Sequence, residues 1–262
     1  MRIFWVILVG IGLSVVPGQV GASNLANPGT PIPEARVAVG VSYHLAGVTI
    51  SNDSIPSLMN RFHVRASYAP LSVVNFGLDL GATQIEVAGD TNEIRAYPGF
   101  HGKYGFSGGG HLKVSTPFFF DGFLAVVGIA SATYFSSKND YSALYGGFDG
   151  NGGLGLQVHV PGFGYITAGS SLYLIQGSAQ SASGATSSYS NVNNLRGWLA
   201  VDFFPPMKAG ATTNPFLSLE ISVSPKAGIN GRAPLEEISF SISAGSITKR
   251  LYGQESDIEW RP

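Results

Sequence analysis

Residues 217–224 have the sequence LSLEISVS, in which a large apolar residue alternates with a serine or a glutamate. Because successive side chains of a β-strand point to opposite sides of the sheet, this period of two predicts a strand with one apolar and one polar face. The same pattern occurs in 238–244, ISFSISA, and in 36–45, RVAVGVSYHL. After residue 22, no stretch shows a helical period over a dozen residues. The sequence therefore predicts an all-β protein.

The spacing of these segments predicts how they connect. Links such as 69–71 and 161–162 are short and contain proline, whereas the links 46–60, 136–146 and 178–194 are longer and more polar. Short turns that alternate with longer loops are typical of an up-and-down barrel, which has its turns at one end and its loops at the other. We therefore expect an up-and-down antiparallel transmembrane β-barrel of about 10 strands, within a range of about 8–12. The expected strands are 36–45, 61–68, 74–81, 100–115, 122–135, 154–160, 163–176, 195–204, 217–224 and 238–244.

Composition indicates which solvent the apolar faces meet. Charged residues make up 12% of the chain, against about 25% in ordinary soluble domains. A soluble β-barrel turns its polar faces outward, but the polar faces here consist mostly of glycine, serine, threonine and histidine. The apolar faces are therefore expected to contact lipid, and the small polar residues to line a narrow lumen. A secreted soluble β-barrel is the alternative.

The first 22 residues have the features of a secretory signal peptide. Arg2 precedes an apolar run over 3–16, and Ala22 is a small residue at a suitable cleavage position. The run is shorter than the roughly 20 apolar residues of a transmembrane helix. The expected division of the chain is a cleaved signal peptide over 1–22, an N-terminal periplasmic lead-in over 23–35, the transmembrane barrel over 36–252 and a C-terminal tail over 253–262.

Four features together resemble a bacterial outer-membrane β-barrel protein: the signal peptide, the absence of cysteine, the alternating strands with short Pro/Gly turns, and the aromatic strand ends. The resemblance is generic. It implies the cell outer membrane of a Gram-negative bacterium, contact with outer-membrane lipid, and insertion by the barrel assembly machinery. Such proteins end on an aromatic residue, which Tyr252 supplies, but a tail follows it here. The aromatic residues expected at the membrane interfaces are Tyr68, Phe118, Phe119, Phe120, Phe123, Phe163, Phe203, Phe204 and Phe216 beside the turns, and Tyr43, Tyr97, Tyr134, Phe135 and Tyr173 beside the loops.

The titratable residues of the predicted strands fall on the polar phase. Because an isolated buried charge is unfavourable, we expect these groups to form a paired network that fills the lumen. No two histidines have a short ligand-like spacing on one strand, so no metal site is expected, and no motif indicates a cofactor. The net charge of −1 gives no basic surface for nucleic acid. The expected lumen-lining residues are Arg36, His44, Arg61, His63, Arg65, Asp79, His101, Lys103, His111, Lys113, His159, Arg196, Asp202, Glu220 and Glu237.

The sequence contains no recognisable catalytic motif. The omptins, outer-membrane proteases of about this size, use paired acidic residues and an Asp-x-His element, and the sequence has neither Asp-x-Asp nor Asp-x-His. We therefore expect no enzyme and no catalytic residues. The expected role is a narrow porin-like channel for small solutes or a structural protein whose loops bind a partner, because about ten strands enclose far less space than a porin. An interface enzyme acting on lipid or peptide is the alternative, and the oligomeric state stays open.

Overall fold

The computed structural model describes residues 32, 34–50, 55–87, 99–191, 194–205, 213–224 and 237–248. Within these ranges all regular structure is β, and no helix is long and apolar enough to cross a bilayer. The expected signal peptide, Tyr97, Tyr252 and the expected tail lie outside the described residues. The strands are β1 (Arg36–Ile50), β2 (Ile55–Leu71), β3 (Val74–Val87), β4 (Phe100–His101), β5 (Lys103–Ser115), β6 (Leu124–Lys138), β7 (Leu144–Val160), β8 (Gly164–Gln180), β9 (Thr186–Ser190), β10 (Leu195–Phe203), β11 (Thr213–Ser224) and β12 (Glu237–Thr248).

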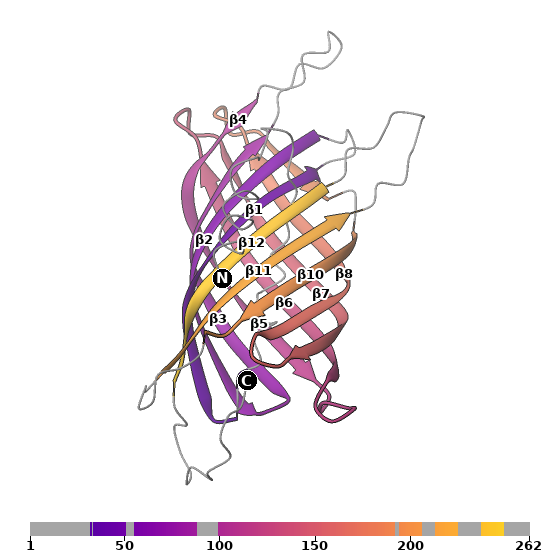
Figure 1. The fold of residues 1–262 in the computed structure, drawn as a ribbon. Coiled ribbons are helices and arrows are strands. Elements are labelled where there is room, and N and C mark those ends of the chain that lie inside the picture. The colour runs from indigo at the N-terminus through magenta and orange to yellow at the C-terminus, as the bar shows by residue number, and fades with distance from the viewer. Residues whose placement is uncertain are drawn as a thin grey trace, which may run out of the picture.

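Ten of these strands form a closed antiparallel barrel with strongly tilted strands (Figure 1). The ring runs β1, β2, β3, β5, β6, β7, β8, β10, β11 and β12, and β12 pairs with β1 from Ala38↔Ile247 to Ala46↔Ser239. The two short strands are additions, because β4 pairs with β3 and β9 with β8. A closed ring leaves no strand edge with unpaired N–H and C=O groups, as hydrocarbon surroundings require. The prediction of a ten-stranded up-and-down barrel is confirmed.

Several strands are longer than the sequence predicted. β2 begins at residue 55, so only 51–54 separate it from β1, where the sequence predicted a loop over 46–60. β8 continues to residue 180 and pairs with β9, so much of the serine-rich stretch 178–194 is a β-hairpin that extends the barrel at its loop end. The residues 180–188 are exposed whichever way they point, so no apolar alternation marks them as strand.

The apolar faces of the strands lie on the outside of the barrel. Leu78 is 67% and Leu154 is 69% exposed, whereas Arg61 is 2% and Asp79 is 1% exposed. This distribution is the reverse of the one in soluble proteins, where charged side chains are almost never fully buried unless paired. It is the distribution of a barrel whose exterior contacts lipid and whose interior is polar.

Apolar side chains also fill the interior at both ends of the barrel. Four of the aromatic residues expected at the membrane interfaces, Phe135, Tyr173, Phe204 and Phe216, belong to these interior clusters, so that expectation is wrong for them. Phe135, Tyr173 and Phe216 have the inward phase of their strands, and Phe204 continues the inward phase directly after β10, so proximity to a strand end did not decide their positions. The loop-end cluster is Val48, Ile50, Met59, Ile85, Val87, Phe100, Phe135, Tyr173, Ile175 and Tyr189. The turn-end cluster is Ile32, Ala38, Ala69, Phe204, Phe216 and Ile247.

Candidate functional site: the polar interior

Most of the residues expected to line the lumen are buried inside the barrel. Arg36 and His159 are half-buried near the short-turn end, and the side chain of Glu237 lies outside the described part. Between the two apolar clusters, those of the expected residues that are buried form a polar group in the interior, beside a third apolar cluster of Val127, Ile129, Trp198 and Ala200. The polar group consists of His44, Arg61, His63, Arg65, Asp79, His111, Lys113, Arg196, Asp202 and Glu220.

His101 and Lys103 differ from the expectation, because both are exposed. The strand is interrupted at Gly102, between β4 and β5, and the register shifts again in the first part of β5, so the alternation of the rest of β5 does not extend back to these residues. Phe100, which was expected on the outer face, is buried in the loop-end cluster instead. Lys103 forms an exposed ion pair with Asp140 beside the β6–β7 turn.

An ion pair between Arg61 and Asp149 crosses the interior. Arg61 is on β2 and Asp149 on β7, four strands apart around the ring, and both side chains are almost fully buried. The Nε of Arg61 also donates to Thr83 Oγ1 at 3.1 Å, and its guanidinium lies 5.2 Å from the ring centroid of Phe135. Tyr173 donates its hydroxyl to Asp149 Oδ2 at 3.5 Å. The pair therefore joins two distant walls just below the loop-end cluster.

Two rows of inward-facing residues cross β2, β3 and β5, each with a serine, a glycine and a histidine. The serine and the histidine exchange strands between the two rows. One row is Ser67–Gly77–His111, and the other is His63–Gly81–Ser107, with Arg65 and Asp79 between them. In each row a histidine reaches over a glycine of β3 to a serine on the strand beyond. A Cβ on Gly77 would lie 2.6 Å from Cε1 of His111, and a Cβ on Gly81 would lie 2.8 Å from Cδ2 of His63. Glycine is therefore what lets both imidazoles cross β3.

The first row forms a chain of hydrogen bonds with a carboxylate. Ser67 Oγ is 2.7 Å from His111 Nε2, and His111 Nδ1 is 3.0 Å from Asp79 Oδ2. The other oxygen of Asp79 accepts from Arg65 Nε at 2.5 Å. A carboxylate accepts only, so a neutral His111 donates from Nδ1 to Asp79 and accepts at Nε2 from the Ser67 hydroxyl. All four side chains are buried.

The second row contains a similar pair without the carboxylate. His63 Nε2 is 2.8 Å from Ser107 Oγ, but His63 Nδ1 has no hydrogen-bond partner among the described residues. The ring of His44 lies 6.2 Å from that of His63, and neither of its nitrogens is hydrogen-bonded within the described part. The two Ser–His pairs therefore differ chiefly in what their second imidazole nitrogen meets.

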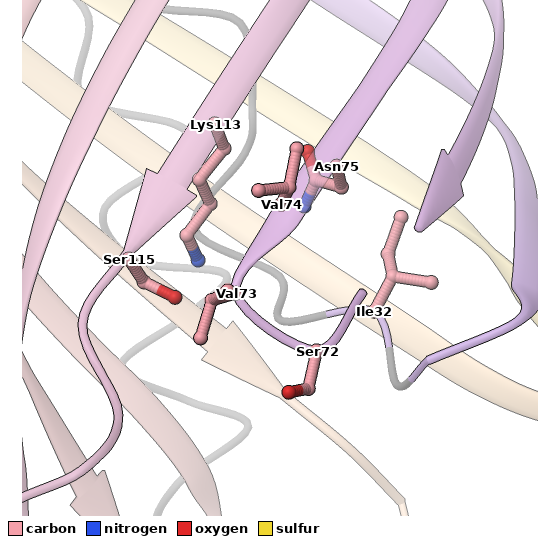
Figure 2. A pocket seen from close by; sticks show the side chains of 7 residues that line it. All are labelled: Ile32, Ser72, Val73, Val74, Asn75, Lys113 and Ser115. Atoms are coloured by element: carbon pink, nitrogen blue, oxygen red, sulfur yellow. The ribbon is translucent and has the colours of Figure 1, made fainter. Parts of the chain in front are cut away.

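A small pocket opens at the short-turn end beneath the first row. Its inner lining includes Asn75 and Lys113, which pair with each other one inward-facing position beyond Gly77 and His111. Figure 2 shows the side chain of Lys113 extending toward the β2–β3 turn. The pocket is lined by Ile32, Ser72, Val73, Val74, Asn75, Lys113 and Ser115. Over the described ranges, no group of three or more His, Cys, Asp or Glu side chains is placed to hold a metal ion.

Sequence reasoning missed the partners that complete these interactions. Asp149 was not identified because the glycine-rich start of β7 has no apolar alternation. Its signal was its phase, since Asp149 and Asn151 continue the polar face that Gln157 defines further along the strand. Ser67 had no distinguishing signal among the many serines, because its partner His111 is brought near only by the pairing of β3 with β2 and β5.

Comparison with known proteins gives no family for the chain. No protein-family model matches it, and no curated protein matches it in sequence. Solved structures similar to it include the translocator domain of the autotransporter NalP from Neisseria meningitidis, with a TM-score of 0.47, 10% identity and 95% of each chain covered. The outer-membrane protease OmpT from Escherichia coli has a TM-score of 0.43 and 9% identity, covering 81% of this chain and 95% of its own.

A third similar structure is the CymD monoaromatic hydrocarbon channel, with a TM-score of 0.26 and 10% identity. The match covers 88% of this chain and 93% of that chain. These three proteins are a translocator domain, a protease and a channel, so the shared fold assigns no role to this chain. Its closed ring of strands, its apolar exterior and its polar interior are those of an outer-membrane β-barrel protein.

Proposed function

We propose that this protein is a structural, non-porin barrel of the Gram-negative cell outer membrane, closed to the diffusion of solutes, which presents its loop end for contact with a partner. The observation that carries the proposal is the ion pair between Arg61 and Asp149, which occupies the interior between β2 and β7. The apolar clusters at both ends support it, because they fill the ends of the lumen with side chains.

The energetics of the ion pair favour a lumen that stays closed. A buried charge whose partner moves away is left without compensation, and breaking such a pair costs about 3–5 kcal/mol. Besides Asp149, Arg61 contacts two further groups, Thr83 and the ring of Phe135, so opening this level would break several contacts together. These contacts favour a lumen that opens rarely over a permanently open pore.

The loop end of the barrel is the part that we expect to contact a partner. The hairpin of β8 and β9 extends beyond the ring, and its exposed residues are mostly serine, threonine and alanine. The proposal includes the expectations that a cleaved signal peptide exports the chain, that the barrel assembly machinery inserts it, that outer-membrane lipid surrounds its apolar faces, and that the loops point out of the cell.

Conductance across a planar bilayer tests the closed interior. Wild-type protein is expected to give no steps above the background. The triple variant Arg61→Ala, Asp149→Ala, Phe135→Ala removes the ion pair and the adjoining ring together, so it is expected to conduct. The matched control is Lys103→Ala with Asp140→Ala, which removes an exposed ion pair at the rim and should leave the bilayer silent. A large, steady current through the wild-type barrel would overturn the proposal in favour of a channel.

A further inference from the structure

We propose that Ser67 and His111, positioned by Asp79, form a nucleophilic acyl-transfer site inside the barrel that accepts a short-chain carboxylic ester from the short-turn end. This inference goes beyond the non-enzymatic role proposed above and does not depend on whether the lumen conducts. It starts from geometry, because the three residues come from three strands and no sequence motif connects them.

The two hydrogen bonds meet the geometric requirements of an activated serine. A serine hydroxyl is a weak nucleophile unless a general base accepts its proton, and the base must be oriented by a third group. The distances of 2.7 Å from Ser67 Oγ to His111 Nε2 and 3.0 Å from His111 Nδ1 to Asp79 Oδ2 satisfy both conditions. Arg65 binds the remaining oxygen of Asp79, which fixes the carboxylate for its interaction with His111.

Comparison with the second Ser–His pair indicates why the proposed nucleophile is Ser67 and not Ser107. Ser107 and His63 are about as close, at 2.8 Å, and are more deeply buried, but Nδ1 of His63 has no hydrogen-bond partner among the described residues. Without an acceptor at Nδ1, nothing holds the imidazole in the tautomer that takes a proton from serine. The barrel thus contains a matched pair that differs in the positioning carboxylate.

The pocket at the short-turn end lies beneath the site, and a substrate that enters there must pass Asn75 and Lys113 to reach Ser67, which is not part of the pocket lining. Asn75 and Lys113 lie one inward-facing position from His111, about 7 Å along the strands. They place an amide and an ammonium between the pocket and the row, and Lys113 Nζ donates to Gln157 Oε1 at 3.4 Å. Donors of this kind stabilise the negative charge that develops on a carbonyl oxygen when they come within hydrogen-bond distance of it. The apolar lining of Ile32, Val73 and Val74 suits a short acyl chain. The small size of the pocket excludes long lipid chains.

The reaction balances without a co-reactant other than water. Ser67 Oγ attacks the carbonyl carbon of the ester, a C–O bond forms, and the hydroxyl proton passes to His111 Nε2. The bond from that carbon to the alcohol oxygen then breaks, and the departing alcohol takes the proton from Nε2. Water attacks the acyl-serine by the same route, which releases the carboxylic acid and restores the Ser67 hydroxyl.

The test is covalent labelling of the full chain, folded in detergent micelles, with a small alkyl fluorophosphonate, followed by peptide mass spectrometry. Label is expected on Ser67 and not on Ser107. Ser67→Ala should abolish labelling, His111→Gln should slow it by roughly 100-fold or more, and the matched control Ser107→Ala should label within about twofold of wild type. Hydrolysis of p-nitrophenyl acetate should follow the same order.

The positioning role of Asp79 needs its own measurement. In protein labelled with ¹⁵N-histidine, the nitrogen shifts of His111 should show the Nδ1–H tautomer in wild type and lose it in Asp79→Asn, together with slower labelling of Ser67. Labelling is read on the wild-type chain itself, so a variant that fails to fold does not leave the question open. Folded wild-type protein that takes no label, or that labels Ser107 as readily as Ser67, would overturn the proposal.

Discussion

Arginine placed at Leu80 should measure the lipid contact of the outer face. Leu80 is on β3, and its side chain is exposed on the outside of the barrel. A strand that rises about 3.4 Å per residue and is tilted by about 40° climbs about 2.6 Å per residue along the barrel axis. Leu80 is then about 16 Å from the level of Val74, the first residue of β3, and about 18 Å from that of Val87, the last. It therefore lies near the middle of the strand and of an apolar band about 25 Å tall that is centred on the strand.

The depth of the substituted residue sets the expected magnitude. Arginine on the lipid-facing side costs about 2–4 kcal/mol at the bilayer midplane and about 0–1 kcal/mol near the interfaces. Leu80→Arg should therefore lower the free energy of unfolding by about 2–4 kcal/mol. Phe120→Arg, at the exposed β5–β6 turn, should lower it by about 1 kcal/mol or less. Leu80→Ala corrects for the loss of the leucine side chain.

The assay is urea titration of folding into phospholipid vesicles, followed by tryptophan fluorescence. The comparison of interest is the difference between Leu80→Arg and Leu80→Ala, because it isolates the charge. If arginine cost the same at Leu80 and Phe120, or no more than alanine at Leu80, the outer face would not be in hydrocarbon and the barrel would be a soluble one.

Gly77→Ala should destabilise the barrel by about 1–3 kcal/mol, because the new methyl group would overlap the backbone oxygen of Ala66 and the ring of His111. Gly152→Ala, where the nearest atom is 4.0 Å away, is its control in the same urea titration. A protease site inserted at Gly184, in the exposed link between β8 and β9, should be cut on intact cells, whereas one inserted at Pro161, in the β7–β8 turn, should be protected. The reverse cleavage pattern would invert the proposed orientation.

The alternation of apolar and polar residues predicted the barrel because each strand carries the information for its own two faces. Val39 and Val41 are exposed and Ser42 is buried, as their phase in the sequence requires. The pattern did not predict strands in regions where both faces have the same surroundings, as in the β8–β9 hairpin. It also failed at His101, because an irregularity at Gly102 changes the phase without a clear trace in composition.

The interior was predictable as a list of residues but not as a set of contacts. Phase alone placed Arg61 and His111 on the polar face, but their partners depend on which strands become neighbours and in what register. Asp149 meets Arg61 only because the sheet curves until β2 and β7 face each other. Such a contact is a property of the closed ring, so no local pattern around either residue contains it.

The pairing of β1 with β12 has a consequence for how the barrel forms. This seam joins the two ends of the described chain, and the inward-facing residues at its middle are small, with Gly40 beside Gly245 and Ser42 beside Ser243. Every other junction of the ring joins strands close in sequence, so each can form while the chain is still incomplete. Only the seam between β1 and β12 joins the first strand to the last, and contacts so distant in sequence form slowly. Its small side chains add little packing, so the same line is where the ring should part first when the barrel unfolds.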